Sequence, residues 1–159
     1  MAKLNQYFCI ILLGLAPTLS FAEDVCSDDR LDIKSGGTSV RFTVDVVDTP
    51  EGRAQGLMNV ESMPRFTGML FVYPREMPVA FWMRNTLIPL DMIFIDEDGV
   101  VQTIHENAIP LDETSIPSNA DVKYVLEING GMSNMLKLAP EAVVRHPAID
   151  GENIAWPCE

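Results

Sequence analysis

The stretch 81-FWMRNTLIPLDMIFID-96 joins two apolar runs through a polar connection, and this arrangement decides how the chain around it folds. Its ends, 81–83 and 92–95, have the composition of buried strands. Between them, Pro89 cannot continue a strand ladder, so the chain is expected to reverse there. The stretch therefore predicts a β-hairpin whose polar tip either meets water or forms the floor of a site.

Further strands are expected on both sides of this hairpin. VRFTVDVV (40–47) alternates apolar and polar residues, which is typical of a strand with one wet face. Other strands are expected over 30–35, 68–74, 78–85, 90–99, 100–108, 122–129 and 141–147. Short helices are expected over 50–57, where Thr49 can cap the first turn, and over 132–138.

The spacing of these elements predicts a mainly β protein, an antiparallel sandwich or barrel-like sheet with two short helices. Turns follow one another too closely to leave a crossover helix between each pair of strands, which argues against a doubly wound parallel sheet. Two runs, 69–73 and 92–95, are apolar on both faces and must be covered on both sides. We expect the helices or long loops to cover the second face.

The amino terminus is typical of a secretory signal peptide. Lys3 precedes the apolar run 7–15, and Ser20 and Ala22 supply the small residues of a cleavage site after Ala22. The run is too short to span the roughly 30 Å of a bilayer's hydrocarbon core. We therefore expect residues 1–22 to be removed. Residues 23–159 would then form a single β domain, periplasmic or secreted, with no membrane insertion after cleavage.

Two cysteines, Cys26 and Cys158, remain after this cleavage, one near each end of the domain. A pair of cysteines in an exported chain predicts one disulfide between them. Two free thiols, or a bridge between two chains, are the alternatives. Neither cysteine belongs to a CxxC motif or has a nearby histidine, so no redox or zinc role is expected.

The chain is acidic, with a formal net charge of -12. Nucleic-acid binding needs clustered lysine and arginine residues, so we expect no nucleic-acid partner. The same charge disfavours binding to anionic membrane surfaces. Solubility and mutual repulsion between copies are sufficient reasons for such acidity.

Candidate binding residues gather around the expected hairpin tip. Reversal of the chain would bring Asn85 and Asp91 together, with Trp82 as an aromatic wall of a shallow polar pocket. A buried carboxylate needs a partner, and Arg84 or Arg53 could supply one for Asp91. The alternative is that Asn85 and Asp91 only brace the turn by hydrogen bonding to backbone amides.

The sequence contains none of the common catalytic motifs. There is no Gly-x-Ser-x-Gly elbow, no His-Glu-x-x-His helix and no phosphate-binding glycine loop, so no catalytic residue, cofactor or metal is expected. Methionines scattered among apolar strand residues are more typical of core packing than of copper binding. One enzymatic alternative stays open, a hydrolase-like site that uses Asp91 with His105 or Glu127.

Five sequence blocks together resemble the domain of unknown function 192 family, over about Leu31 to Pro147. In chain order they are TPEGRAQGLM, GMLFVYP, FWMRNTLIPLDMIFID, IHENAIP and VLEINGG. The resemblance implies a small, often exported, mainly antiparallel β domain, and it brings no established activity. The matching positions are Arg53, Gly56, Met58, Phe81, Trp82, Met83, Asn85, Thr86, Pro89, Asp91, Glu127 and Gly130.

These observations favour a non-enzymatic accessory or ligand-binding domain. Its partner would be a small polar molecule or another envelope protein. The residues expected to form the binding site are Arg53, Trp82, Asn85, Thr86, Asp91 and Glu127.

Overall fold

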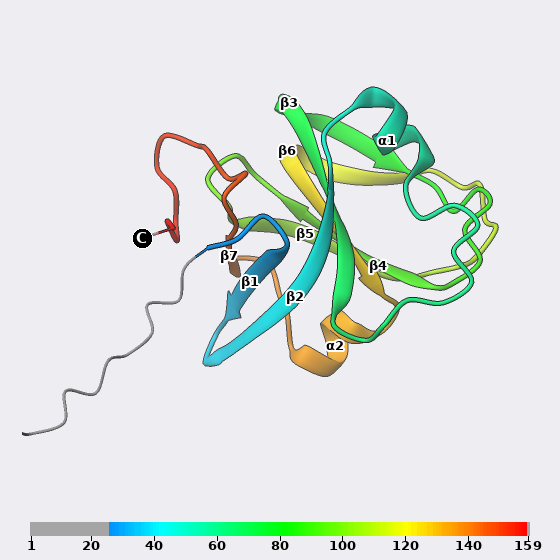
Figure 1. Ribbon diagram of the computed structural model, residues 1–159, viewed down its shortest axis with the longest axis horizontal. Helices are drawn as coiled ribbons and strands as arrows, with labels where there is room; N and C mark the ends of the chain where they lie inside the picture. The colour runs from blue at the N-terminus through cyan, green and yellow to red at the C-terminus, as the bar shows by residue number, and fades with distance from the viewer. Residues whose placement is uncertain (1–25, 159) are drawn as a thin grey trace, which may run out of the picture.

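The computed structural model describes residues 26–158, so the expected signal peptide, residues 1–22, lies outside the described residues. The elements are β1 (Arg30–Ser35), β2 (Thr38–Val47), α1 (Pro50–Gln55), β3 (Thr67–Phe81), β4 (Leu90–Ile95), β5 (Val101–Ala108), β6 (Ile116–Asn129), α2 (Met132–Leu136) and β7 (Val143–Arg145). Figure 1 shows their arrangement and confirms the predicted mainly β fold with two short helices. Within this part of the chain, every helix is too short or too polar to cross a membrane.

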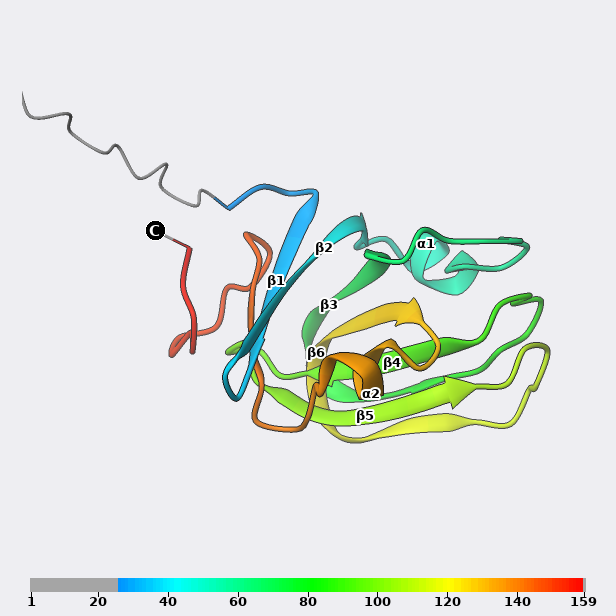
Figure 2. The ribbon, with the colours of Figure 1, turned by 90° about the horizontal axis from the view of Figure 1, so that it is seen from below.

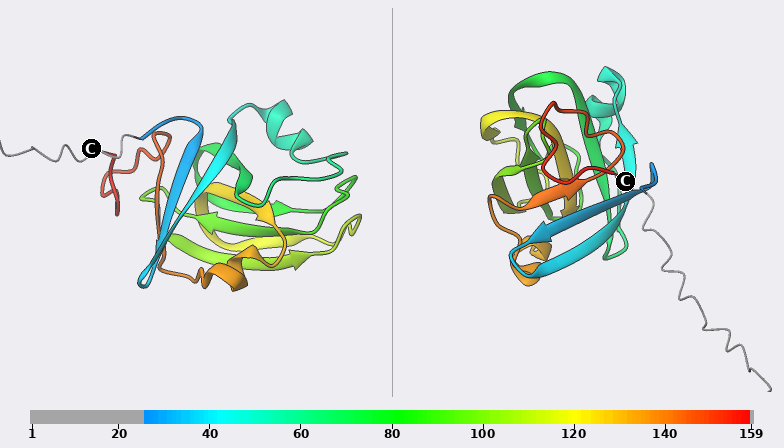
Figure 3. Two further views of the ribbon diagram at one scale, coloured as in Figure 1. Left: turned by 60° about the horizontal axis from the view of Figure 1, so that its bottom comes forward. Right: turned by 90° about the vertical axis from the view of Figure 1, so that its left-hand side faces the viewer.

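The strands form one curled sheet in the order β5-β4-β6-β3-β2-β1-β7. The β-hairpin predicted for 81–96 is therefore wrong, because β6 lies between β3 and β4 and each of the two pairs with β6 instead. The curl brings the two edges together, because Val100, next to β5, bridges Val143 of β7 at the opposite edge. The result is a barrel-like sheet, which Figures 2 and 3 show from further sides. All paired strands are antiparallel except β2 and β3, which run parallel. The segment that contains α1 returns the chain to the same end of the sheet before β3 begins.

One long strand, β3, replaces the two strands expected over 68–74 and 78–85. It pairs with β6 along both of its halves. A shift in register between Val72 and Met77 accommodates Pro74. The strand also bends, because Phe81 near its end packs edge-on against Phe71 near its start, with the ring centroids 5.1 Å apart. The bent strand forms part of the wall of a cavity on one face of the sheet.

The sheet has an apolar core on each face, and β4 contributes to both. Ile93 and Ile95 belong to one core, whereas Met92 and Phe94 belong to the other. The second core is covered by the bent end of β3 and by the loop that begins at Leu57. A bent strand therefore does part of the covering that was expected from helices and long loops.

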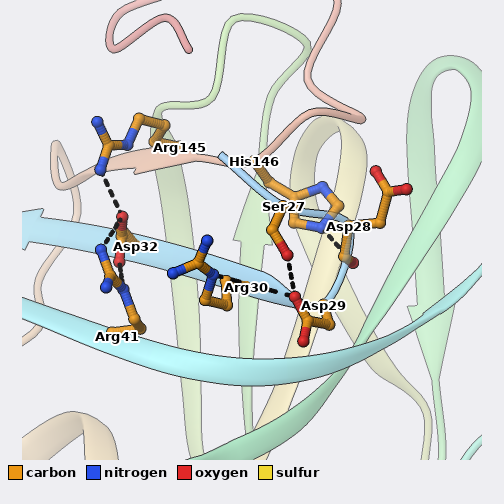
Figure 4. A network of polar contacts seen from close by, with 8 residues as sticks. All are labelled: Ser27, Asp28, Asp29, Arg30, Asp32, Arg41, Arg145 and His146. Carbon is orange, nitrogen blue, oxygen red and sulfur yellow. Dashed lines mark hydrogen bonds and ion pairs between the residues drawn. The ribbon is translucent and has the colours of Figure 1, made fainter. Parts of the chain in front are cut away.

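A charged network joins the three strands at the far edge of the sheet (Figure 4). Asp32 of β1 lies directly opposite Arg41 of β2 and Arg145 of β7. Its Oδ1 atom accepts a hydrogen bond from Nε of Arg41, and its Oδ2 atom accepts one from Nη2 of Arg145, each at 2.7 Å. Burial alone would raise the pKa of Asp32, but the bonds and charges of the two arginines outweigh it and hold the pKa below its usual range.

The predicted disulfide between Cys26 and Cys158 is confirmed, with the two Cα atoms 5.7 Å apart. It closes a loop of nearly the whole domain, since the cysteines are 132 residues apart in sequence. Trp156, close to the second cysteine, packs beneath the charged ends of Lys34 and Arg145, 3.6 and 4.5 Å from its ring centroid. Both ends of the described chain are thereby held against β1 and β7.

Candidate functional site

A cavity of about 310 Å³ lies between α1, two separate parts of β3 and Glu127 near the end of β6. Four of the six predicted binding residues line it: Arg53, Trp82, Thr86 and Glu127. Sequentially distant segments supply these residues, and the bend in β3 brings them together. The cavity is at the small end of the size range typical of small-molecule sites.

Glu127 is the buried polar group of the cavity, with 4% of its surface exposed. It lies on β6 between Met69 of β3 and Met92 of β4, its two cross-strand neighbours. Its Oε2 atom has no hydrogen-bond partner among the described residues. Burial raises the pKa of Glu127 to about 8, so the carboxyl group is mostly protonated at neutral pH. A buried carboxyl without a partner costs free energy unless something else in the cavity satisfies it.

Arg53 enters the cavity from the last turn of α1. Its Nη1 atom donates to the backbone carbonyl of Asp48 and, at 2.8 Å, to that of Val72. The guanidinium carbon lies 5.0 Å from the ring centroid of Tyr73, which is a cation–π distance. These contacts fix one end of the guanidinium group and orient the rest of it.

Tyr73 lies within electrostatic reach of both charged residues. Burial raises its pKa; the Arg53 charge lowers it, and the Glu127 charge raises it further. Tyr73, Phe71 and Met69 are alternate residues of β3, so they project from the same face of the sheet as Glu127. Tyr73 was not among the predicted binding residues. Two observations in the sequence could have indicated it: Tyr73 is separated by two and four residues from Phe71 and Met69 on the same expected strand, and Glu127 is one of the positions that match the family.

The turn that follows β3 supplies the opposite wall. Trp82 is 45% exposed, and the Arg84 guanidinium carbon lies 5.4 Å from its ring centroid. Thr86 is buried, and its hydroxyl donates to the Arg84 carbonyl at 3.4 Å. The wall thus offers an accessible aromatic face and a hydroxyl group to whatever occupies the cavity.

A close approach between α1 and β3 shapes the floor. Gly56 ends α1 with a positive φ of 46°, and a Cβ atom there would lie 3.3 Å from the Phe71 ring. Thr49 begins the same helix, and its side chain accepts a hydrogen bond from the Gly52 amide. A capped start and a glycine end let a helix of only six residues place Arg53 over the sheet.

Asn85 and Asp91 do not line this cavity. Asn85 is an exposed turn residue with a φ of 55°, and its backbone carbonyl accepts from the Asn59 amide at 2.8 Å. An asparagine adopts this left-handed conformation more readily than most residues. Its position is that of a residue that shapes the turn and links it to the loop after α1.

Asp91 is completely buried and bonded to backbone amides. Oδ1 accepts from the amides of Asn107 and Gly131, each at 2.8 Å, and Oδ2 accepts from that of Ser133 at 2.7 Å. Neither expected arginine partner is used. The contacts of Asp91 match the bracing alternative, although the amides that it binds belong to β5 and to the first residues of α2 with its N-cap, rather than to the connection between β3 and β4.

The three residues of the enzymatic alternative are not brought together. Asp91 and Glu127 project from opposite faces of the sheet, since Asp91 is paired with Ile128, the residue next to Glu127. His105 is exposed on the edge strand β5. Within residues 26–158, no group of three or more histidine, cysteine, aspartate or glutamate residues is arranged to hold a metal ion.

A family model matches residues 31–146, most of the described chain. The family is domain of unknown function 192 (DUF192), with the description "Uncharacterized ACR". The chain belongs to the DUF192 family. This confirms the resemblance noted in the sequence, and no curated protein matches the chain.

Two solved structures are similar to this DUF192 protein over most of its length. One, from Sinorhizobium meliloti and provisionally described as a transcription regulator, is 40% identical with a TM-score of 0.72, covering 76% of this chain and 94% of its own. The other, a protein of unknown function from Novosphingobium aromaticivorans, is 36% identical with a TM-score of 0.71, covering 72% of this chain and 82% of its own. These two proteins therefore share the fold of this chain, but their descriptions give it no activity, and its function is inferred from the cavity.

Proposed function

We propose that this protein is a non-enzymatic binding domain of the cell envelope that holds a small polar molecule in the cavity beneath α1. The supporting observation is Glu127, which lines this cavity and whose buried Oε2 atom has no hydrogen-bond partner in the described chain. A ligand that donates a hydrogen bond would supply the missing partner. Arg53, Trp82 and Thr86 complete a set of polar and aromatic contacts around it.

The cavity favours a small molecule over an envelope protein as the partner. At about 310 Å³ it encloses a small ligand, whereas a stable protein interface extends over roughly 800 Å² of each partner. The transcription-regulator description of the Sinorhizobium meliloti protein does not carry over, because a net charge of -12 opposes nucleic-acid binding.

Chemical-shift mapping during a screen of small polar fragments tests this function. Fragments that bind should shift the amide signals of α1 and of residues 82–86. The Glu127→Gln substitution should weaken the binding of these fragments and so reduce the shifts. Glu106→Gln, a change of the same kind at an exposed position of β5, serves as the matched control. A screen in which no fragment perturbs the cavity signals would refute the proposal.

The envelope location rests on the leader-like residues 1–22. Amino-terminal sequencing of protein from the native host should find Glu23 as the first residue. Protein that still begins at Met1 would contradict export with cleavage after Ala22.

A further inference from the structure

The cavity contains an arginine and a carboxyl group that do not neutralise each other. Arg53 and Glu127 form no ion pair, although both are among the described residues. Burial accounts for the raised pKa of Glu127, with no opposing effect from the Arg53 charge, whereas the pKa of Tyr73 responds to both groups. The two groups are therefore separated, with Tyr73 within reach of each.

The guanidinium group of Arg53 has one edge in use and one available. Nη1 donates to two backbone carbonyls, whereas Nη2 and Nε make no hydrogen bond to any residue in 26–158. These two nitrogens form the edge that binds a carboxylate through two parallel hydrogen bonds. Because Tyr73 and the backbone hold the group in place, little entropy is lost when such a ligand binds.

Glu127 can provide the contact for the other end of a ligand. A neutral hydroxyl group could donate to its Oε2 atom, whereas a cation would stabilise the ionised carboxylate and displace the proton that the free site carries at neutral pH. Aromatic rings stand nearby, since Phe71, Tyr73 and Trp82 line the same cavity. Ring faces attract an ammonium group and repel an anion, which favours a cation at this end.

We propose that the ligand is a small zwitterion of the free α-amino acid class, with its carboxylate on the Arg53 edge and its ammonium group at Glu127. The proposal rests on the function proposed above and adds the chemical class of the ligand. A simple cation would leave Arg53 without an anion, and a simple anion would leave Glu127 without a donor. The cavity volume of about 310 Å³ suits a molecule of this size.

Binding of this ligand is coupled to a proton. The ammonium group pairs with the ionised carboxylate, so the proton that Glu127 carries at neutral pH passes to the solvent. Two other ionisable residues line the cavity, Arg53 and Tyr73. An arginine keeps its proton in proteins, and the pKa of Tyr73 is raised. The cross-strand neighbours Met69 and Met92 carry no charge. Glu127 is therefore the group that sets the pH dependence of binding near neutrality.

Calorimetric titration with matched probes tests the proposal on the protein with its disulfide intact. The probes are L-leucine and L-phenylalanine, their decarboxylated amines isopentylamine and 2-phenylethylamine, and the deaminated acids 4-methylpentanoate and 3-phenylpropionate, with D-glucose as a neutral polyol. At least one amino acid should bind about tenfold or more tightly than its own amine and acid. In Arg53→Met, the amino acid should bind no more tightly than its amine. In Glu127→Gln, it should bind no more tightly than its acid. Arg75→Met, at an exposed position, should change neither difference in affinity.

The pH dependence supplies a second readout. Affinity of the wild-type protein for the amino acid should rise about tenfold from pH 6 to pH 7 and level off above pH 8, with one proton released per ligand. Glu127→Gln should abolish both effects. If an amine, an acid or glucose binds as tightly as the amino acids, the proposed zwitterionic ligand class is wrong, but the proposed binding function is not refuted. If no probe binds, the zwitterion is refuted, and the fragment screen decides separately whether the cavity binds anything.

Discussion

Asp91 and Glu127 lie on neighbouring strands of one sheet, yet their side chains enter opposite cores. Asp91 pairs with Ile128 of the first core, and Glu127 pairs with Met92 of the second. Both are buried carboxyl groups, but Asp91 accepts three backbone hydrogen bonds, whereas the Oε2 atom of Glu127 accepts none. The first therefore has the contacts of an architectural residue, whereas the second is the residue on which the proposed binding function rests.

Asp91→Asn should destabilise the fold. An asparagine in the same position presents an NH₂ group where Oδ2 now accepts from the Ser133 amide, which leaves a buried donor unsatisfied. We expect a loss of about 1–3 kcal/mol in the free energy of unfolding, measured from urea midpoints. Asp121→Asn, at an exposed position of β6, is the control.

The same variant tests whether Asp91 and Arg53 share one network. The structure records no contact between them, so the losses caused by Asp91→Asn and Arg53→Met should add in the double variant. A coupling energy above about 0.5 kcal/mol would show that Asp91 acts on the cavity after all.

Glu127→Gln should raise stability at alkaline pH and change its pH dependence. Between its ordinary value of 4.5 and the folded value of about 8, the folded protein retains a proton that the unfolded chain releases. Stability contributed by this proton is complete below pH 4.5 and is lost as pH rises through 8, by at most about 1.4 kcal/mol per pH unit. Urea midpoints from pH 5 to pH 9 should show this fall in the wild-type protein and in Glu106→Gln, but not in Glu127→Gln. Equal slopes in all three would contradict the burial of an unpartnered carboxyl.

Replacing both Cys26 and Cys158 by serine should lower the free energy of unfolding. The bond closes a long loop, so chain-entropy arithmetic gives a loss of up to about 4–5 kcal/mol. Denaturation of the wild-type protein with reductant should match the serine variant, which itself should not respond to reductant. Identical midpoints for oxidised and reduced wild-type protein would show that the bond adds no stability.

Gly68→Ala should disturb the pairing of β3 with β6. A Cβ atom at this position would run into the backbone carbonyl oxygen of Glu127 and lie 3.1 Å from the Ile128 side chain. Relief of such overpacking typically costs about 1–3 kcal/mol, which a urea midpoint detects. Gly37→Ala, where a Cβ atom meets nothing within 4 Å, should cost far less, and equal losses would refute the steric explanation.

Local patterns in the sequence predicted most of the elements but not how they are brought together. The alternation of 40–47, the apolar run 92–95 and the Thr49 cap each act over a few residues, and the elements formed where expected. The parallel pairing of β2 with β3 depends on the path of the chain through α1, which has no local signal. The prolines of 74–78 indicated two strands, whereas pairing with β6 continues β3 through them.

The candidate site was predictable to a similar degree. Arg53, Trp82, Thr86 and Glu127 were selected, and the curl of the sheet places all four around one cavity. Asp91 was also selected, but its partners are 16 to 42 residues further along the chain, and only the folded sheet shows that backbone amides satisfy it. Strand alternation alone separates Asp91 from Glu127, once the register between β4 and β6 is known.

The closure of the chain by Cys26 and Cys158 gives the domain the connectivity of a ring. With these two Cα atoms 5.7 Å apart, a short peptide could join the ends in place of the sulfur bridge. New ends could then be opened at the exposed Gly36–Gly37 turn between β1 and β2, far from the cavity in sequence and free of close contacts. A circularly permuted protein of this design would keep every strand pairing and lose only the covalent connection between β1 and β2. The order of the strands along the chain is therefore one of several that give the same sheet.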